Sequence, residues 1–595
     1  MKTLKYILLC AGTLSFSACN SWLDEDPQYS INTKTAFETK ESAQMALQGC
    51  YGYMANDNGY GQAWQELMVS ASGFGWFQTN GNDQDDYTSL RAIPASTLIN
   101  MAWSGMYKVI GEANAFIANI EGSPLEESVK QTMVAEAKFL RALAYFNVVT
   151  IWGDAPFKTT PSASDAVALP RVEKATILAQ VEQDWVDAFN DLPEKANDGF
   201  ASKWAAKAFL GKLYYTQACQ GDQAGWEKAK ACFDEVYNKG VYGLQPKFAD
   251  LFVNNVTGSK ESIFQLNYSS AGATSRNRGS WLFAPTNSTA GKSWSRIRAS
   301  KVLYDYFRGT YPGDPRLDAT FQSKWRNYTA NGQVATQVEP VSSARDTTYA
   351  YPLVTYDSKE TPEGWNKSKL LVAEIPYDQL PDPTNPSASV LGSGKYAGMD
   401  ELIKKYMENT ADNQGWPYFK KPIDLVVSAQ NSHKNIFVYR YADMLLMMAD
   451  VYNELGDKNK AIDLADEVLA RARQSGSEPS DQPARWSASL TKEQVKEKIY
   501  FERIMEFAGE PGMYQIVRAR GTEMLKKALE LNNHHELVLL HVSNTSTGVN
   551  NFRDRIFNNG DLSEDFLKKN LLLPIPKNEI DTNSAINFSD NNFGY

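Results

Sequence analysis

Histidine, cysteine and long apolar runs are all scarce in this sequence. Its 595 residues include 4 histidines and 5 cysteines. So few histidines argue against a histidine-rich metal site, and so few cysteines exclude a disulfide-stapled scaffold. Beyond the N-terminal leader, no stretch approaches the ~18 uncharged apolar residues that indicate a transmembrane helix. We therefore expect a soluble body that is long enough to bury a large core.

Concentrated positive charge is missing as well. The formal net charge is −10, the isoelectric point is about 5.3, and no lysine- and arginine-rich block stands out. Since nucleic-acid binding depends on such a basic surface, we predict no nucleic-acid partner. Among the few cysteines, Cys219 and Cys232 could pair in an oxidising compartment or remain two buried thiols.

The motifs of common catalytic sites are absent too. The stretch "LGSGKY" lacks the first glycine and the final serine or threonine of a phosphate-binding loop. The stretch "HHELVLLH" has Leu539 where a zinc protease needs histidine, and His535 and His541 are too far apart to share a helix face. We predict no catalytic site, no metal and no cofactor. A pair of catalytic carboxylates among the 70 acidic residues remains an open alternative.

The N-terminus carries a leader. Lys2 and Lys5 precede a short apolar run over 6–16, which is typical of a secretory signal peptide. Cys19 follows this run almost at once, as in a bacterial lipobox, so we predict that residues 1–18 are removed and that Cys19 is lipidated. Two or more acyl chains give stable anchoring. The alternative is a plain secreted protein in which Cys19 is incidental.

The rest of the chain divides into two helical parts and a loop-rich part. Residues 19–33 are polar and form a tether, and residues 34–595 form a single domain. Helical spacing dominates about 34–242 and about 431–530. Two segments match the tetratricopeptide pattern, with small residues where the paired helices meet; the matching residues are Leu210, Gly211, Tyr214, Ala229, Phe233, Met448, Ala449, Tyr452 and Ala461.

These patterns predict a mainly α fold of tetratricopeptide-like helical hairpins. Ordinary hairpins that share small residues by chance are the alternative. The part between them, about 243–430, is rich in glycine, proline, asparagine, serine and threonine. Long irregular segments inside compact proteins usually carry function, so we expect this part to bind a ligand.

Several longer segments carry a family resemblance. They are "CNSWLDEDP", "KFLRALAYFNVVTIWGDAPF", "YGLQPKFADLF", "SKESIFQLNY", "RYADMLLMMADVYNELGD" and "LLLPIPKNEIDTN". In this order they resemble the SusD/RagB family of Bacteroidota outer-membrane lipoproteins. Two segments depart from the family pattern: "FERIMEFAGE" and the closing "NNFGY".

The resemblance implies a fold, a function and a location. The fold is tetratricopeptide-like, and the function is binding of nutrient oligosaccharides for a TonB-dependent transporter of the SusC type. The location is the outer membrane, through the lipid anchor and facing the cell exterior, and Asp24, Glu25 and Asp26 resemble the signal for surface export. A family member that binds peptides and a surface glycoside hydrolase are the alternatives.

Two segments have the composition that a sugar site needs. Sugars present apolar C–H faces and a rim of hydroxyl groups, so their sites combine aromatic planes with polar side chains. The first is "GFGWFQTNGNDQDDY", and the second consists of the stretches "SRNRGSWLFAP" and "AGKSWSRIRAS". With one tryptophan farther along the chain, the candidate ligand contacts are Trp76, Phe77, Asn80, Asp83, Asp85, Tyr87, Trp281, Trp294, Arg296 and Trp325. For the first segment, aromatic anchoring in the core and a calcium loop are the alternatives.

Replacing Cys19 with alanine should release the protein from the outer membrane, because the acyl chains would have no thiol to carry them. Cell fractionation and immunoblotting measure this release. The Cys50→Ala variant is the matched control and should stay in the membrane fraction. Equal retention of the Cys19→Ala protein would contradict the anchor.

Overall fold

The computed structural model describes much, but not all, of the chain. The described residues are 35–77, 87, 90–161, 168–196, 199–268, 276–285, 288, 293–327, 347–350, 352–357, 370–374, 416–424, 430–540 and 562–595. The leader, Cys19 and the tether lie outside these residues and stay predictions.

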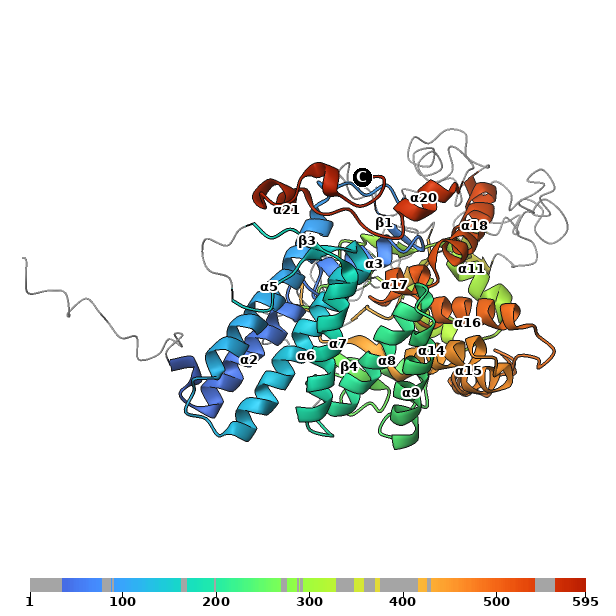
Figure 1. Ribbon diagram of the computed structural model, residues 1–595. Helices are drawn as coiled ribbons and strands as arrows, with labels where there is room; N and C mark the ends of the chain where they lie inside the picture. The colour runs from blue at the N-terminus through green and yellow to red at the C-terminus, as the bar shows by residue number, and fades with distance from the viewer. Residues whose placement is uncertain are drawn as a thin grey trace, which may run out of the picture.

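Most of the long helices form one continuous array. They are α2 (Lys40–Ala55), α5 (Thr97–Ile120), α6 (Glu127–Trp152), α7 (Lys174–Asp191), α8 (Lys203–Cys219), α9 (Ala224–Lys239), α14 (Tyr441–Glu454), α15 (Lys458–Arg473) and α16 (Lys492–Glu506). Each helix packs against the next, and α14 packs against α9 although the loop-rich part separates them in sequence (Figure 1). No helix of the described residues combines the length and apolar character needed to cross a membrane.

The predicted helical hairpins are confirmed, and α8 with α9 shows why small residues are needed in them. A β-carbon added to Gly211 of α8 would lie 2.3 Å from the ring of Phe233 in α9. Ala229 of α9 is fully buried in the same hairpin. Glycine and alanine therefore let the two helices approach closely enough for Phe233 to fill the space between them.

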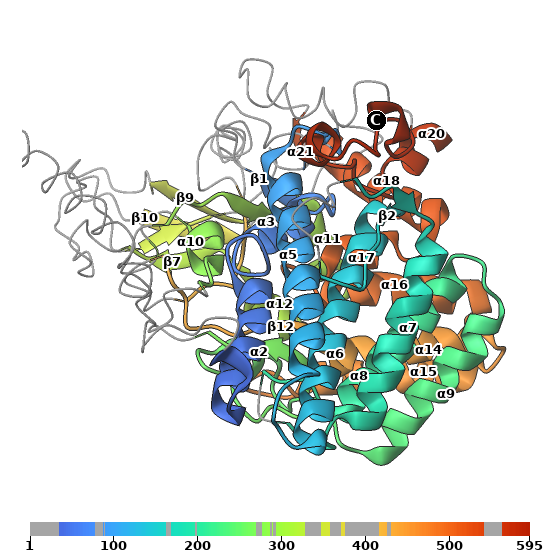
Figure 2. The same cartoon turned by 60° about the vertical axis from the view of Figure 1, so that its left-hand side comes forward.

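Short elements make up the loop-rich part, which lies to one side of the array (Figure 2). They are η2 (Phe248–Phe252), β4 (Ser262–Leu266), α10 (Gly279–Phe283), β5 (Ile297–Ala299), α11 (Lys301–Thr310), α12 (Arg316–Thr320), β6 (Phe321–Gln322), β7 (Lys324–Arg326), β8 (Thr347–Tyr349), β9 (Leu353–Asp357), β10 (Leu370–Glu374), β11 (Tyr418–Phe419) and β12 (Ile436–Arg440). The described strands form two-stranded antiparallel ladders. In one of them β12 pairs with β4 and then leads directly into α14.

The remaining elements come from the N-terminal part of the described chain, from the connection between α6 and α7, and from the C-terminal part. They are η1 (Thr35–Phe37), α3 (Ala63–Ser70), β1 (Gly75–Phe77), β2 (Ala155–Pro156), β3 (Arg171–Val172), α17 (Met513–Arg518), α18 (Gly521–Leu540), α20 (Glu564–Lys569), α21 (Lys577–Thr582) and η7 (Phe588–Asp590). The C-terminal segment crosses the ends of α5 and α6, where the backbone N–H of Leu573 donates to the carbonyl of Ile151 at 2.8 Å. The side chain of Asn592 donates to the carbonyl of Trp152 at 2.8 Å, so this segment caps the end of α6.

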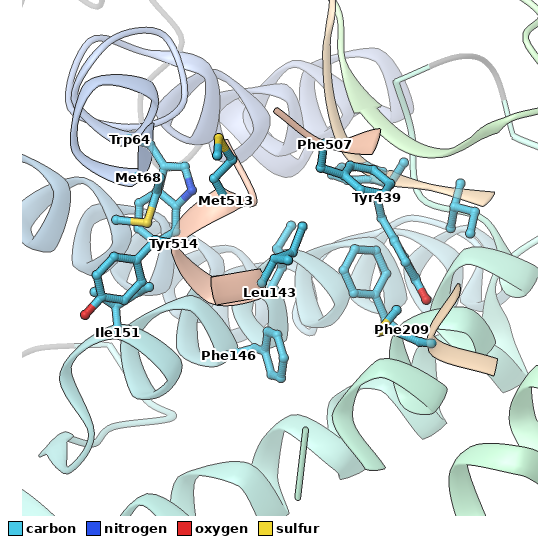
Figure 3. Packing of buried hydrophobic residues seen from close by; sticks show 14 of the residues in the cluster. Trp64, Met68, Leu143, Phe146, Ile151, Phe209, Tyr439, Phe507, Met513 and Tyr514 are labelled. Carbon is cyan, nitrogen blue, oxygen red and sulfur yellow. The ribbon is translucent and has the colours of Figure 1, made fainter. Parts of the chain in front are cut away.

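One large apolar core connects these elements. Figure 3 shows part of it, where Trp64 and Met68 of α3 lie close to Tyr514 of α17. Farther along, Phe209 of α8 packs on Tyr439 of β12, with ring centroids 5.0 Å apart. The core therefore extends from the helical array into the loop-rich part.

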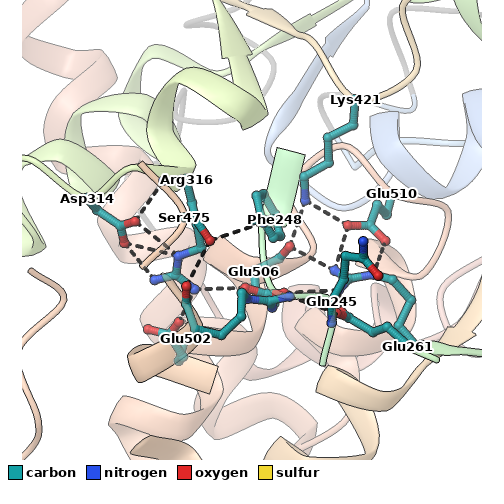
Figure 4. A network of polar contacts seen from close by, with 12 residues as sticks. Gln245, Phe248, Glu261, Asp314, Arg316, Lys421, Ser475, Glu502, Glu506 and Glu510 are labelled. Carbon is teal, nitrogen blue, oxygen red and sulfur yellow. Dashed lines mark hydrogen bonds and ion pairs between the residues drawn. The ribbon is translucent and has the colours of Figure 1, made fainter. Parts of the chain in front are cut away.

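A network of buried charges joins the helical array to the loop-rich part (Figure 4). Arg440, the last residue of β12, contacts Glu261 at 2.5 Å, Glu506 at 3.0 Å and Glu510 at 2.8 Å. Arg316 of α12 contacts Glu506 at 2.8 Å. Arg440, Glu261, Glu506 and Arg316 are each at most 1% exposed.

The network continues on both sides. Its other members are Asp314, Lys421, Arg471 and Glu502. Acids outnumber bases by one across the whole network, and the pKa values of two of its carboxyl groups shift in opposite directions. Three arginines lower the pKa of Glu506 to about 2 against the effect of burial. Burial instead raises the pKa of Glu502, and Arg316 acts against this rise.

The variant Glu506→Gln should unfold at much lower denaturant concentration than the wild type. It leaves three buried arginines short of a counter-charge, and breaking a buried ion pair costs about 3–5 kcal/mol. The folded-state pKa of Glu506 lies below its unfolded value, so its contribution is complete above pH ~5 and is lost as the pH falls.

Urea unfolding at several pH values measures both effects. The wild type should lose stability as the pH falls from ~5 towards ~2, and the Glu506→Gln variant should lose less over that range. Glu478 is exposed and serves as the control, since Glu478→Gln should change the unfolding free energy by under ~0.5 kcal/mol. Equal stability of the Glu506→Gln variant and the wild type would contradict the role given to the network.

Candidate functional site

The two segments with sugar-binding composition lie side by side in the structure. Strand β1 pairs antiparallel with β5, which places Trp76 opposite Arg298 and Gly75 opposite Ala299. The backbone of Ser300 also donates to the carbonyl of Phe74 at 2.9 Å. The predicted contacts that come from separate parts of the chain are thus brought into one region.

Trp76 lies mostly inside this region. Its side chain is 8% exposed and stacks on Trp416, with ring centroids 4.4 Å apart and an angle of 18° between the rings. The ammonium group of Lys301 lies 4.7 Å from the centroid of the Trp416 ring. For Trp76, the geometry is therefore that of an aromatic anchor, and only a small edge of its indole can meet a ligand.

Trp294 is the exposed aromatic residue of the site. Its side chain is 39% exposed, and every other tryptophan in the described chain is less exposed than this. Trp281 meets it edge to face, with ring centroids 5.3 Å apart and rings at 79°. The guanidinium carbon of Arg296 lies 4.1 Å from the Trp294 ring centroid. Trp294 is thus an accessible aromatic surface held by two neighbours that were predicted with it.

Arg296 is itself fixed from the helical side. Its guanidinium group lies 3.1 Å from the carboxylate of Glu66, a fully buried residue of α3. Gln62 donates to the other oxygen of this carboxylate at 3.1 Å. Burial raises the pKa of Glu66, and Arg296 acts against this rise. The ion pair therefore connects the exposed Trp294 to the core of the protein.

A second ion pair braces the same region. Arg278 contacts Asp57 at 2.7 Å, and Arg276 lies 3.9 Å from the same carboxylate. The Arg276 side chain is 47% exposed. It adds a cationic hydrogen-bond donor to this part of the surface.

Two further predicted contacts support the region from inside. The hydroxyl of Tyr87 accepts a hydrogen bond from the backbone of Leu98 at 3.0 Å, and the Tyr87 side chain is fully buried. Trp325 is 4% exposed and packs edge to face on Tyr418, with ring centroids 5.4 Å apart. Both side chains are buried, so neither offers surface to a ligand in this structure.

The other predicted residues lie partly or wholly outside the described chain. Phe77 pairs with Ile297 through its backbone, and its side chain is not described. Asn80, Asp83 and Asp85 fall outside, together with the calcium-loop alternative for their segment. Elsewhere in the described ranges, no group of three or more histidine, cysteine or acidic side chains is arranged to hold a metal ion.

The cysteines are free thiols wherever the structure describes them. Cys219 and Cys232 do not form a disulfide, which agrees with the alternative of two separate thiols. Burial raises the pKa of Cys219 to about 12 and that of Cys232 to about 11, so neither is a reactive thiolate near neutral pH.

Sequence reasoning missed several residues of the site. Trp416 and Tyr418 hold Trp76 and Trp325 in place, and Glu66 holds Arg296. The stretch "GWPYF" at 415–419 has a dense aromatic composition that could have drawn attention to it. Glu66 gave no signal, because one carboxylate on a helix is indistinguishable from the exposed acids around it.

Known proteins resemble the chain over nearly its whole length. A sequence model described as "SusD family" matches residues 260–595, and one described as "Starch-binding associating with outer membrane" matches residues 21–215. Among relatives, SusD-like protein P25 of Formosa agariphila is 26% identical over 530 residues, which span 86% of this chain and 88% of that protein.

Solved structures share the fold. A SusD homolog from Bacteroides thetaiotaomicron superimposes with a TM-score of 0.70 at 19% identity, covering 95% of this chain and 98% of that one. A laminarin-binding SusD-like protein superimposes with a TM-score of 0.59 at 20% identity, covering 94% of this chain and 100% of that one. These likenesses agree with the predicted tetratricopeptide-like fold.

The variant Trp76→Ala should be destabilised far more than Trp294→Ala. Truncating a buried tryptophan costs about 3–5 kcal/mol, because it removes packed apolar contacts and leaves a cavity beside Trp416. Truncating the exposed Trp294 should cost under ~1 kcal/mol. Urea unfolding of the two variants in parallel measures the difference. Equal unfolding midpoints would show that Trp76 is not packed as the structure has it.

Proposed function

The chain belongs to the SusD family, and on that premise we propose that it is a cell-surface lipoprotein that captures a nutrient oligosaccharide. It delivers this oligosaccharide to a TonB-dependent transporter of the SusC type in the outer membrane. The observation that carries the binding role is the exposed indole of Trp294 with Arg296 packed against it. The chain acts as a binder in this proposal and not as an enzyme.

The chemistry of the region suits a sugar. An indole covers the apolar C–H face of a sugar ring, and nearby donors orient its hydroxyl groups. Arg296, whose guanidinium group lies against the Trp294 ring, is a charged donor of this kind. Trp281 and the ion pair from Arg296 to Glu66 hold the platform before the ligand arrives, which lowers the entropy cost of binding.

The family descriptions support the sugar class and the location. One of the two matching sequence models is described as starch-binding and as associating with the outer membrane. A solved structure with the same fold is a laminarin binder. Both starch and laminarin are glucans, and both are neutral, so the proposed ligand class is a neutral oligosaccharide.

The proposed anchor and partner follow from the N-terminal segment. In this proposal Cys19 carries the acyl chains, and the polar tether over 19–33 spans roughly 45 Å when extended, at about 3.3 Å per residue. A body on such a tether can pivot above a transporter and still stay at the membrane. Asp24, Glu25 and Asp26 lie on the tether and would direct the protein to the cell exterior.

The variant Trp294→Ala should bind its oligosaccharide about tenfold more weakly than the wild type. An indole that covers ~60 Å² of sugar surface contributes about 1.5 kcal/mol at ~25 cal/mol per Å². A glycan array identifies the ligand, and isothermal titration then compares the dissociation constants of both proteins.

Phe588→Ala provides the matched control for this titration. Phe588 is 57% exposed in η7 of the C-terminal segment, so its truncation removes an exposed ring without touching the Trp294 platform. Affinity should be unchanged in this variant. Binding of a protein digest but of no glycan would overturn the proposed ligand class, and full affinity in Trp294→Ala would overturn the proposed site.

A further inference from the structure

A cavity lies between the helical array and the C-terminal segment, away from the region around Trp294. Its volume is about 690 Å³, within the ~300–1,000 Å³ range of small-molecule sites. Its walls come from α6, the first residue of α7, α8, β12, α14, α16, α17 and the start of α18, and from the residues around α20. It shares no lining residue with the region around Trp294, so it is a separate site.

The inner wall of the cavity carries more positive than negative charge. Arg503 contacts Asp443 at 2.8 Å, and Lys212 lies 3.4 Å from the same carboxylate. The two cations lower the pKa of Asp443 against the effect of burial, so the carboxylate stays ionised. Two basic side chains thus face one carboxylate. Burial lowers the pKa of Lys212, and Asp443 acts against this fall.

Another part of the wall carries Lys174, whose ammonium group donates to the side-chain oxygen of Gln220 at 2.8 Å. The carboxylate of Asp154 accepts a hydrogen bond from the Lys174 backbone at 2.8 Å and attracts the ammonium group, but among the described residues no carboxylate forms a direct ion pair with it. Burial lowers the pKa of Lys174 to about 8. A bound anion would restore the favourable environment that burial has removed from this ammonium group.

The remaining wall is more apolar than polar, although Arg440 with its partner Glu510, Arg518 and Lys568 also line it. Phe146 of α6, which Figure 3 shows projecting from its helix, lines the cavity together with Phe507. Leu572 and Phe593 close it from the C-terminal segment, and the Phe593 side chain is 58% exposed. An occupant therefore needs an apolar body as well as a negative charge.

We propose that this cavity binds a small amphipathic carboxylic acid, with a medium-chain alkyl or aryl body and a single carboxylate. The carboxylate pairs with Lys174, with the basic side chains of Lys212 and Arg503 nearby. The apolar body covers Phe146, Phe507 and Leu572. A neutral oligosaccharide suits the cavity less well, because it brings no negative charge to the basic side chains of the wall.

Decanoate is a suitable probe, and molecules of the same chain length provide its controls. Isothermal titration of the full-length protein compares decanoate with decanol and with decyltrimethylammonium. Decanoate should bind with the highest affinity. Decanol, which lacks the charge, should bind at least about tenfold more weakly, and the cation should not bind measurably.

Three variants locate the binding. Gly512 lines the cavity, and an added β-carbon there would meet only the side chain of Ile516, at 3.9 Å. The variant Gly512→Phe should therefore fill the space and abolish decanoate binding. The variant Lys174→Met keeps the length of the side chain without its charge and should weaken binding roughly tenfold. Lys228→Met on α9 is the matched control, since Lys228 is exposed and outside the cavity.

Oligosaccharide affinity separates this inference from the proposed function. It should be unchanged in all three variants, because Trp294 lies elsewhere. Circular dichroism confirms that each variant is folded, and Lys174→Met tests the cavity even if Gly512→Phe fails to fold. Decanoate binding that is equal in wild type and Lys174→Met, or equal for decanoate and decanol, would overturn the proposal whatever the outcome of the glycan experiments.

Discussion

Arg440 connects three parts of the chain through buried charge, and the arrangement of the molecule depends on it. It is the last residue of β12 and the N-cap residue of α14. Its guanidinium group contacts Glu261, just before β4, and Glu506 and Glu510 around the end of α16. Removing such charges from water is costly, so each must keep its partners. Any other placement of β12 against α16 would leave buried arginines and glutamates unpaired. The network therefore selects one way of joining the loop-rich part to the helical array.

The candidate site depends on this connection between the loop-rich part and the helical array, and on two strand pairings. Pairing of β12 with β4 fixes one side of the loop-rich part, and pairing of β1 with β5 fixes the other. Between them, the ion pair from Arg296 to Glu66 brings the segment of Trp294 onto α3. The loop-rich part thus has irregular backbone but several fixed attachments. These attachments allow a residue on a loop to present a constant surface to a ligand.

Much of the fold could be predicted from the sequence, because helices that pack on one face repeat their apolar residues at fixed spacing. Gly211 and Ala229 identified a close hairpin for the same reason, since only small residues fit there. The ion network could not be predicted, because the chain has 70 acidic residues and sequence does not show which of them meet in space. Some of its members nevertheless lie in segments that the sequence analysis singled out: Glu261 in "SKESIFQLNY", Arg440 in "RYADMLLMMADVYNELGD", and Glu506 in "FERIMEFAGE", one of the two departures from the family pattern.

The candidate site was predictable as a region but not residue by residue, and the two tryptophans Trp76 and Trp294 show the reason. Both lie in glycine- and serine-rich surroundings, and composition alone makes them equivalent. Trp76 is buried because Trp416, far along the chain, stacks on it, whereas Trp294 has Arg296 and Trp281 beside it and keeps part of its surface free. Burial of one tryptophan gives the other its rigid base, since β1 carries Trp76 and pairs with the strand that follows Trp294. An anchoring aromatic and a presenting aromatic are therefore both needed, and only tertiary contacts decide which residue takes which role.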